Sequence, residues 1–336
     1  MPRRASAAVT LADVARVAGV STATVSNALN SVGRMSQTTR RHVRSIAREL
    51  GYIPYGGNQG VAGESRVLGL AVTTDHPVSW GFAEIAYFSQ AVQAATAVAH
   101  EHGYSLVVRP TAVGPERWTD LAVDGMMLID SPQGDPVRAE LRRHGIPVVF
   151  SGRPPVPEHD DVWIDNDVES AVRGVLDHLA AAGAARIALL GGDTTDYYIQ
   201  SCMATYRQWC AERGQPPLIE LMRCKDPAPA VARLLARRPA PDAVFGPYDR
   251  CGHVLLSAAR SMNLRVPEEL LVVCASESSS YETTSPPVTT LSLDPLGITR
   301  LAMQLLIEIV EGRAPTMPRG AVHPTRLVPR ASSVPA

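Results

Sequence analysis

The chain has 336 residues, of which 45% are hydrophobic and 19% are charged, a composition typical of a globular protein with more than one compact unit. The formal net charge is −1, but residues 1–62 hold eight arginines against two acidic residues, a balance of +6. The remaining residues hold 24 basic and 31 acidic side chains, a balance of −7. This asymmetry indicates a polyanion-binding module joined to a body that avoids polyanions. A membrane-spanning helix is excluded, because no run approaches the roughly 20 apolar residues that it needs.

Residues 1–9 form a basic tail, and a compact helical pattern follows over 10–53. Thr10 is expected to cap a first helix, and Gly19 then supplies a tight turn. Ser21 caps a second short helix that begins at Thr22. A third helix starts after Ser36 and runs through residue 50, with its arginines mainly exposed. A short helix, a glycine turn and a second short helix are typical of a helix-turn-helix.

The run V-T-L-A-D-V-A-R-V-A-G-V-S-T-A-T-V-S-N-A-L-N, followed by V-G-R-M-S-Q-T-T-R-R-H-V-R-S-I-A-R-E-L-G-Y-I-P, resembles the headpiece of the LacI/GalR family of transcriptional regulators. The resemblance implies that the second helix enters the major groove, where Thr22, Ala23 and Asn27 read base edges. Small amide, hydroxyl and methyl groups suit adenine edges and thymine methyls. The full set of predicted DNA contacts is Thr10, Ser21, Thr22, Ala23, Thr24, Ser26, Asn27, Asn30, Tyr52 and Val61.

Residues 54–65 form a glycine-rich hinge. In the family that the headpiece resembles, this segment becomes helical on the operator and an apolar side chain enters the minor groove, a role that falls here to Val61. Three of its glycines, at 56, 57 and 60, each disfavour a helix by about 1 kcal/mol relative to alanine. Two readings stay open: a hinge that folds on DNA with difficulty, or a flexible tether.

From residue 66 onward, short apolar runs alternate with amphipathic segments. Strands are expected over 67–73, 105–109, 125–129, 147–150, 161–164, 186–190, 243–245 and 270–274. Helices are expected over 82–101, 136–144, 168–182, 198–213, 229–236, 250–261 and 297–311. This alternation predicts parallel sheets that are covered on both faces. It predicts an α/β unit that follows the all-α helix-turn-helix headpiece.

The family resemblance continues through V-D-G-M-M-L-I, W-I-D-N-D, P-P-V-T-T-L-S-L-D-P-L-G and H-P-T-R-L-V-P-R-A-S-S. It implies a periplasmic-binding-protein-like pair of lobes, with lobe 1 over about 66–162 plus 295–318. Lobe 2 then covers about 163–294 plus 319–332, so the effector-binding and dimerisation unit spans 66–332. Ligands of open α/β sheets bind at the carboxyl ends of the strands, which here meet between the lobes.

The implied effector site departs from the family pattern. Cys202 stands where the family commonly has an arginine, Cys274-Ala275-Ser276-Glu277 replaces an aspartate motif, and Leu293 replaces a glutamine. A less polar effector, a sugar held by other residues such as Glu277, and a site that no longer binds ligand all stay open. The predicted effector contacts are Phe82, Arg153, Tyr198, Cys202, Tyr248, Asp249, Ser276, Glu277 and Leu293.

No catalytic motif is present, and the five scattered cysteines lack a C-x-x-C pair, so we expect neither an enzyme, a cofactor nor a metal site. A transport-type binding protein shares the two-lobe fold but would not carry the headpiece. One headpiece reads only a few base pairs, which favours a homodimer on a pseudo-palindromic operator. Asp13 interrupts the first apolar run too early for a signal peptide, and we expect a cytoplasmic, nucleoid-associated regulator, most simply a repressor.

Overall fold

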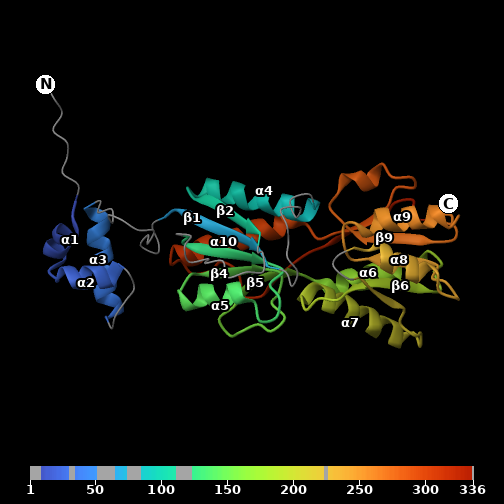
Figure 1. Cartoon of the computed structure of the whole chain (residues 1–336), viewed down its shortest axis with the longest axis horizontal. Coiled ribbons are helices and arrows are strands. Elements are labelled where there is room, and N and C mark those ends of the chain that lie inside the picture. The colour runs from blue at the N-terminus through green and yellow to red at the C-terminus, as the bar shows by residue number, and fades with distance from the viewer. Residues whose placement is uncertain are drawn as a thin grey trace, which may run out of the picture.

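A computed structural model of the chain describes residues 9–29, 35–50, 65–73, 85–110, 123–222 and 226–334. These residues form a helical headpiece and two α/β lobes (Figure 1). The predicted tail, Asn30, Tyr52, Val61, Phe82 and most of the glycine-rich hinge lie outside the described residues.

The headpiece consists of α1 (Leu11–Ala18), α2 (Thr22–Leu29) and α3 (Gln37–Glu49). Its small core contains only aliphatic side chains, which are Val14, Ala15, Ala18, Val25, Ala28, Leu29, Val43, Ile46 and Ala47. Alanines at these positions allow the helices to approach closely, so three short helices bury one shared face. The predicted three-helix headpiece is confirmed.

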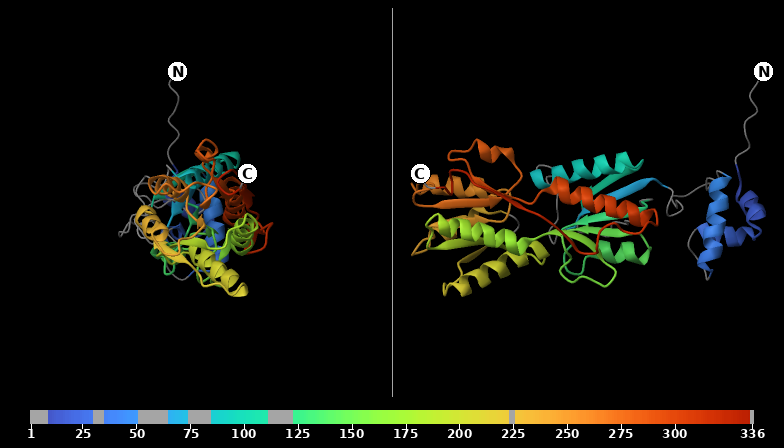
Figure 2. Two further views of the ribbon diagram at one scale, coloured as in Figure 1. Left: turned by 90° about the vertical axis from the view of Figure 1, so that its right-hand side faces the viewer. Right: turned by 180° about the vertical axis from the view of Figure 1, so that it is seen from behind.

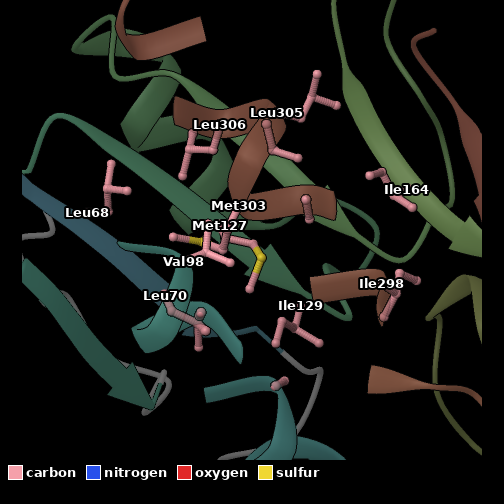
Figure 3. Close-up of a cluster of buried hydrophobic side chains, with 14 of the residues drawn as sticks. Leu68, Leu70, Val98, Met127, Ile129, Ile164, Ile298, Met303, Leu305 and Leu306 are labelled. Atoms are coloured by element: carbon pink, nitrogen blue, oxygen red, sulfur yellow. The ribbon is translucent and has the colours of Figure 1, made fainter. Parts of the chain in front are cut away.

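The sheet of lobe 1 has six parallel strands in the order β11-β5-β4-β3-β1-β2. The strands are β1 (Val67–Val72), β2 (Ser105–Pro110), β3 (Gly125–Ile129), β4 (Val148–Ser151), β5 (Val162–Asn166) and β11 (Ala321–His323). Helices α4 (Ala86–Glu101) and α10 (Pro295–Val310) cover one face, and α5 (Pro136–Arg143) packs on the other. Figure 3 shows the first of these layers, where Met127 and Ile129 of β3 lie with Met303 and Ile298 of α10.

The sheet of lobe 2 has the order β12-β10-β9-β8-β6-β7, and only the pairing of β12 with β10 is antiparallel. Its strands are β6 (Ile187–Gly192), β7 (Ile219–Met222), β8 (Ala243–Gly246), β9 (Leu271–Ala275), β10 (Thr289–Ser292) and β12 (Arg326–Val328). Helices α6 (Val168–Ala181) and α7 (Tyr197–Glu212) share one core, and α8 (Ala228–Leu235) and α9 (Cys251–Ser261) share the other. A short 3-10 turn, η3 (Ser279–Glu282), follows β9. The two lobes follow each other along the long axis, as Figure 1 and the right-hand view of Figure 2 show.

The chain passes between the lobes three times, after β5, after β10 and after β11. Two of these crossings lie later than the sequence predicts, because 162–166 and 321–323 pair within the sheet of lobe 1. The boundaries at 162/163 and 318/319 therefore move by about four residues, since β5 needs both neighbours to bury its apolar side chains.

Side-chain hydrogen bonds tie the three crossing segments together. The Asn166 amide donates to the carbonyl oxygens of Leu293, at 3.0 Å, and His323, at 3.3 Å. The His323 ring lies 2.7 Å from the Asp294 carboxylate, which also accepts from the Gly297 N–H. This cluster of contacts links the three crossing segments, and we expect the lobes to move relative to each other about it.

Candidate DNA interface and effector site

The start of α1 is fixed by a reciprocal cap between Thr10 and Asp13. The Asp13 N–H donates to Thr10 Oγ1, and the Thr10 hydroxyl and N–H both donate to the Asp13 carboxylate at 2.6 and 3.0 Å. The two bonds that the carboxylate accepts from Thr10, followed by the one from Arg16, hold the pKa of Asp13 at about 2. Gly19 ends the helix with φ +66°, a left-handed conformation that other residues adopt at a cost.

Ser21 begins α2 as predicted, with its Oγ accepting from the Thr24 N–H at 3.0 Å. The buried side of the helix carries only aliphatic residues. The opposite side exposes Thr22, Ala23 and Asn27, and leaves Thr24 and Ser26 half-buried. The structure therefore presents on one helix face the side chains that the resemblance assigns to base edges.

Arg40 on α3 differs from the expectation that its arginines lie on the surface. It is half-buried, and its Nε is shielded from solvent without a hydrogen-bond partner among the described residues.

The carboxyl ends of the two parallel sheets meet where the lobes adjoin. Arg153, after β4, donates to the Tyr197 hydroxyl at the start of α7, at 3.4 Å. Its guanidinium lies 5.0 Å from the Tyr197 ring centroid and 5.4 Å from that of Trp163. Two further contacts cross from lobe 1 to lobe 2, from Gln133 N–H to Thr195 Oγ1 and from Gln90 to the Glu277 carbonyl. We call the region of these contacts the interlobe junction. It contains Gln90, Gln133 and Arg153 of lobe 1 and Thr195, Tyr197 and Glu277 of lobe 2.

Most of the predicted effector contacts follow the strands that end at the interlobe junction. They are Arg153 after β4, Tyr198 after β6, Tyr248 and Asp249 after β8, Ser276 and Glu277 after β9, and Leu293 after β10. Cys202 is different, because it has no exposed surface and packs within the core of lobe 2. Burial raises the pKa of its thiol, and its position argues against a ligand contact.

Two of the acidic side chains are held by lobe 2 itself. Glu277 accepts from the Ser292 hydroxyl at 2.8 Å and from the Leu293 N–H at 2.6 Å. Burial nevertheless raises the pKa of this carboxyl. Asp249 accepts a hydrogen bond from Ser276. These contacts fix the loops after β8, β9 and β10, so Glu277 braces the end of β10 as well as adding negative charge.

The sequence prediction missed three polar side chains that lobe 1 brings to the interlobe junction, namely Tyr87, Asp130 and Asp165, and Ser151 lies with them. Burial raises the pKa of Asp165 to about 6, although the N–H groups of Arg153 and Asn166 and the charge of Arg153 act against the increase. Burial also raises the pKa of Tyr87, with added repulsion from the carboxylates of Asp130 and Asp165. The sequence did contain a signal for three of these side chains, because Asp130, Ser151 and Asp165 lie at the ends of apolar strands.

Two tyrosines of lobe 2 border the same region. Tyr198 donates from its hydroxyl to the Pro247 carbonyl at 3.2 Å. The Tyr248 hydroxyl is shielded from solvent and has no hydrogen-bond partner among the described residues. Burial is the main reason that the pKa of Tyr248 lies well above its usual value, and the negative charges of Asp196 and Asp130 add to it.

No helix within the described ranges is long and apolar enough to cross a membrane. The same residues contain no group of three or more His, Cys, Asp or Glu side chains arranged to hold a metal ion.

Comparison with known proteins gives two family matches in succession along the chain. Residues 10–55 match the model "Bacterial regulatory proteins, lacI family", and residues 176–333 match "Periplasmic binding protein-like domain". The HTH-type transcriptional regulator CelR of Thermobifida fusca is 29% identical over 96% of this chain and 98% of its own length. The HTH-type transcriptional repressor CytR of Escherichia coli K12 is 29% identical over 93% of this chain and 92% of its own.

Solved structures match this chain over nearly its full length. A CelR–cellobiose complex is 26% identical, has a TM-score of 0.70, and covers 96% of this chain and 99% of its own. A lac repressor dimer bound to its operator, at 24% identity, shares the fold with a TM-score of 0.66 over 97% of this chain and 99% of its own. The expected two-lobe fold with a helix-turn-helix headpiece is confirmed. The chain thus carries a lacI-family regulatory domain at residues 10–55 and a periplasmic-binding-protein-like domain at 176–333, and over almost its whole length it is similar to DNA-binding transcriptional regulators.

Proposed function

We propose that this regulator represses transcription by binding a pseudo-palindromic operator as a homodimer, and that a small molecule at the interlobe junction controls its affinity for DNA. The observation that carries the DNA-binding part is the exposed face of α2, where Thr22, Ala23 and Asn27 lie together beside a capped turn. These side chains offer an amide, a hydroxyl and a methyl group, which suit base edges in the major groove.

Repression is supported by relatives that are named repressors, among them CytR and the PurR of Vibrio cholerae, which is 26% identical over 90% of this chain. Control by a small molecule is supported by the CelR structure, which is a complex with cellobiose. In this chain the interlobe junction is the favoured effector site, since segments from both lobes meet there and contact each other across it.

Dimerisation is supported by the size of the reading surface. One α2 helix spans only a few base pairs, and specific affinity needs two copies on a two-fold site. Helices α4 and α10 each bury one face in the core of lobe 1 and expose the other, with Gln93 and Thr96 exposed on α4 and Leu296 and Arg300 on α10. Both helices are therefore candidate dimer elements.

The test is selection of DNA fragments from a random pool by the purified protein, followed by sequencing. We expect an enriched motif with two inverted half-sites. In sedimentation analysis of the complex, we expect two chains bound to each duplex. Enrichment of a single asymmetric half-site with one chain bound would contradict the dimer proposal. No enrichment at all would contradict operator recognition.

A further inference from the structure

We propose that the hydrogen bond between Asp294 and His323 limits how far the two lobes turn relative to each other, and that it thereby sets the affinity for operator DNA. We call this contact the hinge bond. Its effect on the lobes follows from the geometry, whereas the link to operator affinity rests on the proposed function. The two side chains are positioning residues, because they act through the lobes and are not among the predicted DNA or effector contacts.

The chain segments that cross between the lobes are short. A single residue, 167, separates β5 of lobe 1 from α6 of lobe 2. Residue 293 alone separates β10 of lobe 2 from Asp294, which caps α10 of lobe 1. Residues 324–325 separate β11 of lobe 1 from β12 of lobe 2. A rotation of the lobes must therefore be taken up by a few backbone torsion angles close to these residues.

The hinge bond joins two of these segments on the side of lobe 1. In lobe 2 the segments run antiparallel, with Ser292 opposite Arg326. Where they enter lobe 1, the Nε2 atom of His323 lies 2.7 Å from Asp294 Oδ2, and the imidazole side chain is only 13% exposed. Asn166 adds the third segment, because its amide donates to the His323 carbonyl at 3.3 Å. The bonded part of lobe 1 thus extends up to the hinge residues, and little backbone is left free to turn.

Asp294 is held in an uncommon backbone conformation. Its φ of +48° is left-handed, a region that aspartate tolerates better than most residues other than glycine. Its Oδ1 accepts from the Gly297 N–H at 3.1 Å, which caps α10. Burial raises the pKa of the carboxyl, but the hydrogen bonds from His323 and the Gly297 N–H outweigh it and bring the pKa below its usual value. Without the imidazole, Asp294 loses one of the contacts that restrain this conformation.

Gly297 provides the space that the hinge bond occupies. A Cβ atom at this position would overlap the Asp294 carboxylate and lie 2.6 Å from the His323 Nε2 atom. The backbone of Gly297 is helical and does not need glycine, since alanine is the better helix former. The hinge bond is therefore what opposes a side chain here, and an alanine at 297 would separate the two partners without altering either of them.

Helix α10 connects the hinge bond to the rest of lobe 1. Its buried residues pack in the core of lobe 1, and its first turn is capped by Asp294. Its exposed side, with Leu296 and Arg300, is one of the two candidate dimer surfaces. Loss of the hinge bond would let lobe 2 adopt more orientations relative to this surface. Operator binding uses only the arrangements that space two headpieces correctly, so the affinity falls with the fraction of such arrangements.

The first test is hydrogen exchange of the full-length protein, followed by mass spectrometry. His323→Leu removes the donor and is read on the peptide 289–298, and Gly297→Ala is read on 321–328, so each readout peptide is free of the substitution. We expect exchange in both peptides to become about fivefold faster. His323→Gln keeps an N–H donor and is expected to retain most of the protection. His144→Leu, exposed at the end of α5, is the control and keeps it fully.

The second test measures affinity for the operator that the DNA selection yields. His323→Leu and Gly297→Ala are each expected to weaken operator binding about fivefold and to leave binding to random DNA unchanged, because the headpiece is intact. Unchanged exchange in both variants overturns the proposal. Damage by His323→Gln equal to that by His323→Leu also overturns it, because the bond would then not be what matters. Faster exchange with unchanged operator affinity overturns the link between the hinge bond and DNA.

The outcomes separate this proposal from the proposed function. If the unmodified protein selects no operator, the proposed function fails, and hydrogen exchange still decides whether the hinge bond restrains the lobes. If the operator is selected but neither variant changes exchange or affinity, the proposed function stands and the hinge bond has no such role. Because the two variants alter different residues, one that does not fold leaves the other to decide.

Discussion

Asn27 lies exposed on α2, about a turn and a half after Thr22, and carries the one amide on that face. Asn27→Ala is expected to weaken binding to the selected operator by about 1–3 kcal/mol, roughly tenfold or more, because an asparagine amide can bond an adenine edge through both its oxygen and its nitrogen and alanine cannot. Binding to random DNA is expected to stay the same. Fluorescence anisotropy at one fixed salt concentration measures both, with Gln215→Ala, at an exposed position after α7, as the control. Equal losses on operator and random DNA would show that Asn27 does not read sequence.

The ionisation of Asp165 is expected to lower the folding stability of the protein, and this can be measured at a single residue. Its folded-state pKa of about 6 lies above the unfolded value, so stability is lost as pH rises from about 4 through 6. The ionised side chain costs about 3 kcal/mol at most above pH 7. Asp165→Asn is expected to recover part of this, and its advantage in denaturant unfolding should grow between pH 5 and pH 8. An advantage that is constant with pH, or that shrinks, would contradict a buried ionising carboxylate.

At the scale of elements, the turn between α1 and α2 depends on backbone conformation rather than on space. An added Cβ at Gly19 meets nothing within 4 Å, but φ is +66°. Gly174, within α6, is equally open and has no positive φ. Gly19→Ala is expected to destabilise the headpiece by about 1 kcal/mol, whereas Gly174→Ala stabilises lobe 2 by up to about 1 kcal/mol. Thermal unfolding of both variants measures this, and the same sign for both would contradict the left-handed turn.

Elements with strong local signals could be predicted from the sequence. All eight expected strands and all seven expected helices of the body are present, with ends displaced by a few residues. Strands β7, β10, β11 and β12 were not predicted, because three or four residues carry little pattern. Thr289, for example, is fully buried, and its hydroxyl group bonds to Arg330 and Ser333 of the C-terminal segment. Such long-range partners leave no local signature.

The candidate site shows the same division. Positions at the ends of apolar strands were readable, as Arg153 and Tyr248 show. The contacts that cross between the lobes could not be predicted, because the contact of Arg153 with Tyr197 joins residues 44 apart in the sequence. The burial of Cys202 could not be predicted for a related reason: its helix buries the face on which it lies, and a sequence alignment gives only the position along the helix.

At the scale of the whole molecule, Arg153 links the two lobes. Arg153→Ala removes a hydrogen bond and two ring contacts, and the lobes are expected to spend more time apart. Small-angle X-ray scattering should then show a larger radius of gyration than that of the unmodified protein. Arg186→Ala, which removes contacts within lobe 2 only, is the control. An unchanged radius for Arg153→Ala would mean that other contacts hold the lobes.

The whole chain joins a basic headpiece to an acidic two-lobe body, and the central claim is that it reads a two-fold operator. The most direct measurement is a titration of the selected operator, a single half-site and a scrambled duplex at several salt concentrations. We expect the full operator to bind at least 1,000-fold more tightly than the scrambled duplex, with affinity falling steeply as salt rises. Equal affinity for all three duplexes, or affinity that does not change with salt, would contradict sequence-specific DNA recognition.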